Sequence, residues 1–270
     1  MRRGAGAAAL LVWCGTAQAQ TPDVTALPAV VPASTKLTLK ADSALLYESN
    51  PLSVVRGAKP AWSRTHTFGA ALDVPVTENL VWAASAQTKF WRYFRFPSYD
   101  DNEVTAGSSL TAKFGAASLS LRYSHYGAYS PDFGRRFELR DDIGASASYR
   151  FVDKERGLSA TPSLGVLQRR DNDHALDRRR LSASLPALWK SGAFSVSGRL
   201  GLAYDLYRLC AAPRCRRDLR LYAEAGAAYE ISKNAELALG VDFERGVSNL
   251  DGKGYNGLTV APKIALQIVF

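Results

Sequence analysis

The chain has 270 residues, of which 47% are hydrophobic and 22% charged, and its formal net charge is +9. This apolar content excludes an intrinsically disordered chain. No window beyond the first twenty residues reaches the run of about 18 apolar residues that a membrane-spanning helix needs. A globular protein and a β-barrel membrane protein remain.

Residues 1–19 have the layout of a signal peptide. Arg2 and Arg3 precede an apolar core over residues 7–13, and residues 17–19 read Ala-Gln-Ala, a small-residue motif that signal peptidase cleaves. An N-terminal anchor helix would need a longer apolar core. The sequence therefore predicts export, with Gram-negative export as the simplest context.

Residues 20–35 contain Pro22, Pro28 and Pro32 and show no lasting periodicity. Such a segment favours an extended, flexible chain. We expect a periplasmic tail here, followed by a single domain over residues 36–270.

From residue 36 onward apolar and polar residues alternate, which is typical of strands with one apolar face. The strands of globular proteins average about 5–6 residues, whereas these segments have the length of tilted strands that cross a bilayer. Twelve segments follow this pattern: 36–47, 62–75, 80–95, 103–114, 118–127, 137–151, 158–169, 178–189, 194–208, 218–230, 235–245 and 257–270.

Short and long connections alternate strictly between these segments. Five are short, such as residues 77–79 and 190–192, and six are longer, such as residues 48–61 and 209–217. This order predicts an all-β fold, a closed antiparallel up-and-down transmembrane barrel of about twelve strands. Its short turns would be periplasmic and its longer loops extracellular.

Two cysteines remain after the leader, Cys210 and Cys215, in the 209–217 loop. An exported protein meets an oxidising compartment, so we expect a disulfide that closes a small extracellular loop. A metal site would need further ligands, and none lie nearby in the sequence. No metal and no cofactor is therefore expected.

Alternate residues of a strand point to opposite faces, and we call these two sets of positions its two parities. The two parities of each predicted strand differ in chemistry. One parity is apolar, with aromatic residues such as Trp82 and Tyr123 near both strand ends, which suits a lipid-facing surface with two aromatic girdles. The other is polar and predicts a mildly basic lumen. The residues expected to line it and contact solute are Lys89, Trp91, Arg122, Arg140, Arg169, Arg180, Arg199, Arg220, Tyr222, Asp242 and Glu244.

Two interpretations of these charges stay open. Arginines dominate the fifth to tenth segments and acids are relatively richer from the tenth round to the first, so opposed charged walls would favour anions on the basic side. Alternatively, the lumen is filled and its arginines and acids only neutralise one another.

Some residues break the apolar parity. Arg64, His66, Arg92, Asp141, Arg179 and Arg245 lie near the loop ends of their segments, where cations can meet lipopolysaccharide phosphates or simply solvent. Pro262 cannot donate to a strand ladder, so we expect a bulge or an unpaired position there.

The end of the chain resembles the C-terminal signal of Gram-negative outer-membrane β-barrels. Ile264, Leu266, Ile268 and the final Phe270 alternate with other residues, as in that signal. The resemblance covers the mature chain and implies insertion into the cell outer membrane by the barrel assembly machinery, with outer-membrane lipid and lipopolysaccharide as neighbours. Residues 47–51, Tyr-Glu-Ser-Asn-Pro, also resemble a first-loop motif of exopolysaccharide-associated and surface-lipoprotein-modifier barrels.

No catalytic constellation is visible in the sequence. His66, His125 and His174 are the three histidines, and none belongs to the His-x-Ser pair of outer-membrane phospholipases. Export also argues against nucleic acid as the partner of the positive charge. The sequence favours a passive channel for small anionic or sugar-like solutes. The alternatives are a non-conducting barrel for envelope assembly, polymer or protein export or surface interaction, and a lipid-acting enzyme.

Overall fold

The computed structural model describes residues 35–51, 59–211, 214–250 and 253–269. Almost all of them lie in fourteen strands and two short 3-10 helices, η1 (Pro97–Tyr99) and η2 (His174–Leu176). The strands are β1 (Lys36–Glu48), β2 (Ala61–Thr77), β3 (Leu80–Tyr93), β4 (Asp101–Phe114), β5 (Ala117–Tyr129), β6 (Arg136–Tyr149), β7 (Phe151–Asp153), β8 (Leu158–Ala160), β9 (Ser163–Asp171), β10 (Arg178–Ser191), β11 (Phe194–Ala211), β12 (Arg214–Ser232), β13 (Ala235–Ser248) and β14 (Tyr255–Val269).

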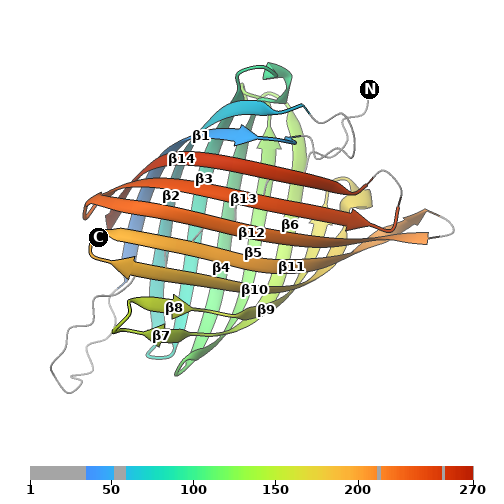
Figure 1. Cartoon of the computed structure of the whole chain (residues 1–270). Helices are drawn as coiled ribbons and strands as arrows, with labels where there is room; N and C mark the ends of the chain where they lie inside the picture. The colour runs from blue at the N-terminus through green and yellow to red at the C-terminus, as the bar shows by residue number, and fades with distance from the viewer. Residues whose placement is uncertain (1–34, 52–58, 212–213, 251–252, 270) are drawn as a thin grey trace.

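Twelve of these strands close into an antiparallel barrel, as the sequence predicts. Each pairs with its neighbour in the chain, β6 pairs with β9, and β14 pairs with β1 to close the ring (Figure 1). Closure leaves the twelve main strands without a free edge, so their backbone donors and acceptors are satisfied inside a membrane.

The strands β7 and β8 form a hairpin between β6 and β9, and β8 pairs with the turn end of β10, on the lower left of Figure 1. The sequence predicts single segments over 137–151 and 158–169, and the structure interrupts each one, at Arg150 and at Thr161–Pro162. At the first break the Arg150 amide donates to the Ala116 carbonyl in the neighbouring turn. At the second break, Pro162 has no amide hydrogen to donate to the strand ladder.

One loop differs from its expected length. The segment 209–217 is not an open loop, because β11 extends to Ala211 and β12 begins at Arg214, with Cys210 opposite Cys215. This hairpin projects from the right-hand end of the barrel in Figure 1, opposite to the β7–β8 hairpin. At the other end, tight turns use left-handed glycines, Gly115 (φ 62°) and Gly192 (φ 58°). No described helix is long and apolar enough to cross a membrane.

Pro262 produces no bulge. The pairing of β14 with β1 keeps one register from Ala44–Lys263 to Tyr47–Val260, although the positions between these pairs are skipped. On the other side Pro262 lies directly opposite Leu239 in β13. The ladder therefore tolerates the missing donor as an unpaired position, one of the two expected outcomes.

Large apolar side chains cover the outside of the barrel. Leu39, Phe68, Leu121, Leu164 and Leu200 are all more than 40% exposed on this surface. Aromatic residues lie toward both rims, such as Trp82 and Phe114 on the turn side and Trp62 and Tyr123 on the loop side. A surface of this kind is stable against lipid and not against water.

Candidate lumen constriction

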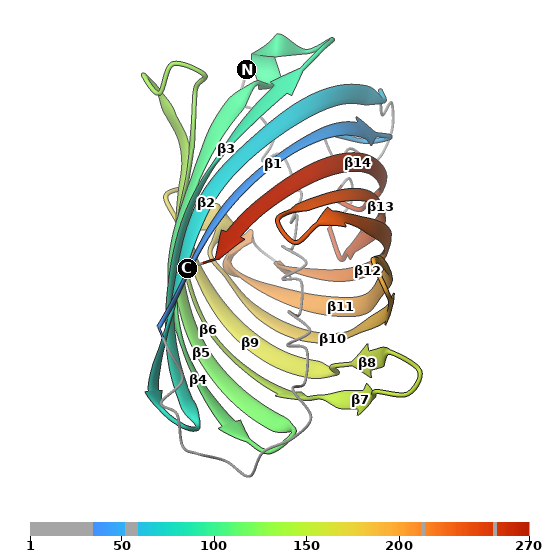
Figure 2. The same cartoon turned by 90° about the vertical axis from the view of Figure 1, so that its left-hand side faces the viewer.

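Inward side chains change in size along the barrel. In the half toward the short turns they are mostly serine, threonine, glycine and alanine, and hydroxyl pairs link neighbouring strands. Ser118 lies 2.8 Å from Ser148, Ser163 lies 2.8 Å from Ser184, and Thr111 lies 3.0 Å from Ser120. We call this turn half of the lumen the vestibule. Figure 2 gives a second view of the strands that surround it.

Large charged and aromatic side chains fill the half toward the loops, which we call the loop-end layer. Its centre is Asp205 on β11, whose side chain is fully buried. The neighbouring strands β10 and β12 present Arg180 and Arg220, whose guanidinium nitrogens lie 2.7 Å from the two carboxylate oxygens. The Nε atom of Arg178 lies 3.5 Å from the same carboxylate. Three guanidinium groups thus share one aspartate.

Further pairs extend this arginine cluster around the wall. Arg220 also lies 3.6 Å from Glu244, which accepts a hydrogen bond from the Tyr255 hydroxyl. Arg169 makes a two-point contact with Asp142, at 2.6 and 2.7 Å. Charge-assisted contacts of this geometry are among the stronger hydrogen bonds in proteins, so these side chains are held in place.

The opposite wall carries a second cluster around Lys89. This lysine is 7% exposed, and its Nζ lies 3.5 Å from the centre of the Trp91 ring, which is itself 4% exposed. The guanidinium of Arg140 lies 3.9 Å from the Tyr126 ring, and the Tyr126 hydroxyl donates to Glu103. Cation–π contacts are worth most where water is excluded.

The other expected lumen residues lie nearer the vestibule. Arg199 is 3.7 Å from Glu224, and Asp242 is the register partner of Glu224 on the next strand. Tyr222 lies with its ring over Gly201. Arg122 is exposed inside the barrel, and no carboxylate in the described part of the chain lies within ion-pair distance of it.

The loop-end layer brings together Lys89, Trp91, Arg140, Arg169, Arg180, Arg220 and Glu244 from the predicted set, but leaves out Arg122, Arg199, Tyr222 and Asp242. Its charges pair with neighbours on adjacent strands and do not form two opposed charged walls. Asp205 lies on the inward face of β11, and its central role depends on the cross-strand register, which alternation alone does not reveal.

Other predicted features lie at the two ends of the barrel. The backbones of Cys210 and Cys215 are partners in the β11–β12 ladder, while the side chain of Cys210 lies outside the described residues, so the disulfide stays a prediction. Ile264, Leu266 and Ile268 all face outward and are 56%, 53% and 47% exposed. Phe270 lies outside the described residues.

A histidine–aspartate pair lies on the outer face near the loop end. His125 Nδ1 is 2.8 Å from Asp141, which also accepts a hydrogen bond from the Tyr123 hydroxyl. The register partners of His125 on the two neighbouring strands are Ala106 and Asp141.

No family model and no curated protein matches the chain. Its fold is similar to those of several solved barrels. The anion-selective porin from Comamonas acidovorans has 11% sequence identity and a TM-score of 0.46, over 87% of this chain and 99% of the porin. The translocator domain of the autotransporter NalP from Neisseria meningitidis has 12% identity and a TM-score of 0.47, over 88% and 90%. LpxR from Salmonella typhimurium has 7% identity and a TM-score of 0.47, over 85% and 99%.

The architecture of the chain itself gives its class. Twelve antiparallel strands close on themselves, the outer face is apolar and the inner face is polar and charged. The chain is a closed twelve-stranded antiparallel β-barrel whose apolar outer face suits a lipid bilayer.

Proposed function

We propose that the protein is a narrow outer-membrane channel for small anionic solutes, with its constriction in the loop-end layer. The observation that carries this proposal is the arginine cluster, in which three guanidinium groups, of Arg178, Arg180 and Arg220, meet two carboxylates, of Asp205 and Glu244. An excess of guanidinium groups at a constriction favours anions over cations.

The vestibule supports a transport role. A barrel that served only as a scaffold would have no need for a hydroxyl-lined space with exposed charges such as Arg122. Solute from the turn side would meet this space first and the arginine cluster afterwards. Sugar stacking fits less well, because Trp91 is buried under Lys89 and offers no free ring face.

A second candidate is a barrel that does not conduct. The complete burial of Asp205 and the near-complete burial of Lys89 favour it, since charged side chains along an open water path would be exposed. In this case the barrel would act through its loops or through the β7–β8 hairpin, in envelope assembly, export or surface interaction.

Conductance in planar bilayers separates the two candidates. The channel proposal expects small, anion-selective currents from the purified protein, and larger currents from Arg180→Ala/Arg220→Ala, because truncation widens the constriction. The matched control is Arg179→Ala. It removes the arginine next to Arg180 on β10, whose side chain lies on the outer face, and should leave conductance unchanged. If neither the wild type nor the double variant conducts, the channel proposal is wrong and the second candidate stands.

A further inference from the structure

Arginines that are neighbours in the sequence have opposite surroundings at the start of β10. Arg178 and Arg180 face inward and contact Asp205, whereas Arg179 faces outward and is exposed. The same outward parity carries Arg170 on β9, Arg217 on β12 and Arg245 on β13. We call these four the outer arginine row: Arg170, Arg179, Arg217 and Arg245.

The row lacks the ion pairs that hold the inner arginines. Within the described ranges of the chain, no carboxylate lies at ion-pair distance from any of its four members, and all four are exposed. Arg179 donates to the side-chain oxygen of Gln168, a neutral group. Asp141, the register partner of Arg170, is already bonded to His125 and Tyr123.

The row lies directly above the lipid-facing surface. Two residues toward the turns from Arg179 and Arg217, at the same parity, stand Leu181 and Leu219, which are 53% and 38% exposed. Phe243, 44% exposed, holds the corresponding place below Arg245. A guanidinium one step above an apolar belt on the loop side lies at the level of the outer-leaflet headgroups.

The spacing of the row suits a ligand with more than one anionic group. Arg179 and Arg217 are both register partners of Leu206 on β11, so they flank one strand and lie two strand spacings apart, roughly 9–10 Å. Arg208 at the loop end of β11 adds an exposed guanidinium, although its Nη1 lies 3.8 Å from Asp177.

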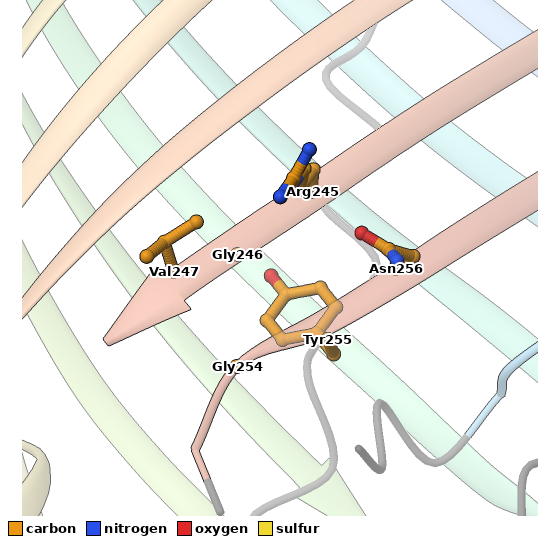
Figure 3. Close-up of a pocket in the computed structure, with 6 residues that line it drawn as sticks. All are labelled: Arg245, Gly246, Val247, Gly254, Tyr255 and Asn256. Atoms are coloured by element: carbon orange, nitrogen blue, oxygen red, sulfur yellow. The ribbon is translucent and has the colours of Figure 1, made fainter. Parts of the chain in front are cut away.

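A shallow hollow of about 190 Å³ extends the row at β13 and β14. Arg245, Gly246, Val247, Gly254, Tyr255 and Asn256 line it, and the Tyr255 ring lies close to Gly246 (Figure 3). Arg245 and Asn256 are register partners across the β13–β14 ladder, and both are exposed, so a guanidinium and a side-chain amide lie side by side. Both groups donate hydrogen bonds to phosphate oxygens.

We propose that the outer arginine row binds the phosphate groups of lipopolysaccharide in the outer leaflet. Guanidinium groups bind phosphate through two parallel hydrogen bonds, and their weak hydration suits the interface between lipid and water. The row remains free to bind phosphate because the acids of the lumen form their ion pairs with inward arginines, Arg169, Arg180 and Arg220. This site is independent of the proposed channel.

Native mass spectrometry of the full chain in detergent, titrated with bisphosphorylated lipid A, tests the proposal. The triple variant Arg179→Gln/Arg217→Gln/Arg245→Gln should bind lipid A roughly tenfold or more weakly, because it loses several charge-assisted hydrogen bonds. The control Lys154→Gln/Arg156→Gln/Lys233→Gln removes the same charge from the exposed turn end and should bind like the wild type.

Two further measurements distinguish the phosphate groups of lipid A from free inorganic phosphate as the ligand. Lipid A without phosphates should bind the wild type as weakly as bisphosphorylated lipid A binds the row variant. Inorganic phosphate at millimolar concentration should compete poorly, since a single phosphate cannot contact separated arginines together. Arg179→Lys/Arg217→Lys/Arg245→Lys keeps the charge and should retain part of the affinity, which guards against a folding defect.

Equal binding by the row variant and the wild type would overturn the proposal. So would equal binding of lipid A with and without phosphates. Displacement of lipid A by low concentrations of inorganic phosphate would also overturn it, in favour of a site for the free ion.

Discussion

Arg180 and Asp205 face each other directly across the β10–β11 ladder and meet through two hydrogen bonds, 2.7 Å from Nε to Oδ1 and 3.0 Å from Nη2 to Oδ2. Asp205 also accepts from Arg220 on the other neighbouring strand. One aspartate therefore ties together three adjacent strands inside the barrel. Removing it would leave guanidinium groups buried without a counter-charge.

The variant Asp205→Asn should destabilise the barrel by about 3–5 kcal/mol, the cost of removing one partner from a buried ion pair. Heat-induced unfolding in detergent, followed by circular dichroism and by the mobility shift of folded barrels on gels, measures this change. Asp73→Asn is the control, because Asp73 is exposed. Equal melting temperatures for both variants would show that the arginine cluster does not stabilise the fold.

The Lys89 cluster gives a second prediction. Trp91 packs with Leu46 and Ala44 inside the barrel and carries Lys89 over its ring. Trp91→Ala should therefore cost about 3–5 kcal/mol, through the cavity it leaves and the lost cation–π contact. Trp82→Ala removes the same side chain from the outer face, where Trp82 is 38% exposed, and should cost less. The same unfolding assay compares the two, and a larger loss for Trp82→Ala would contradict the assignment.

Two inward glycines provide a matched pair. A Cβ at Gly201 would come 2.1 Å from the Tyr222 ring, whereas a Cβ at Gly257 would meet nothing within 4 Å. Gly201→Ala should destabilise by about 1–3 kcal/mol because the ring must move. Gly257→Ala should be neutral or slightly stabilising, since alanine loses less conformational entropy than glycine. The order of the two melting temperatures checks whether Tyr222 lies over β11.

Most of the fold follows from alternation in the sequence. Each of the twelve predicted segments overlaps one of the twelve main strands, because a strand between lipid and water must alternate in polarity along its length. The ends were harder to predict. The β11–β12 hairpin extends through Cys210 and Cys215, where backbone pairing continues although the apolar pattern has stopped. The break before β9 lies at Pro162. A proline is known to interrupt a strand ladder, but the sequence alone does not show at which residue the break falls.

The candidate site was only partly predictable. Parity placed Arg169, Arg180 and Arg220 inward, and the structure has them there. Parity could not tell which acid each would contact, because that depends on the register between strands, which is set by the turns and packing around the whole ring. Asp205 becomes the centre only because Arg180 lies opposite it on β10 and Arg220 lies one diagonal step away on β12.

The asymmetry of the lumen leads to a last prediction about accessibility. Ser120 faces the vestibule, and Thr65 is a 2% exposed residue in the loop-end layer opposite Trp91. In a background with Cys210→Ser/Cys215→Ser, a membrane-impermeant thiol reagent should label Ser120→Cys quickly once it reaches the periplasmic side. Thr65→Cys should stay unlabelled, because packed side chains exclude the reagent. From outside intact cells neither cysteine should react quickly, since the loop-end layer stands between the medium and the vestibule. Fast labelling of Ser120→Cys from outside would mean that the layer is open to molecules of that size, and would contradict a constriction in the loop-end layer.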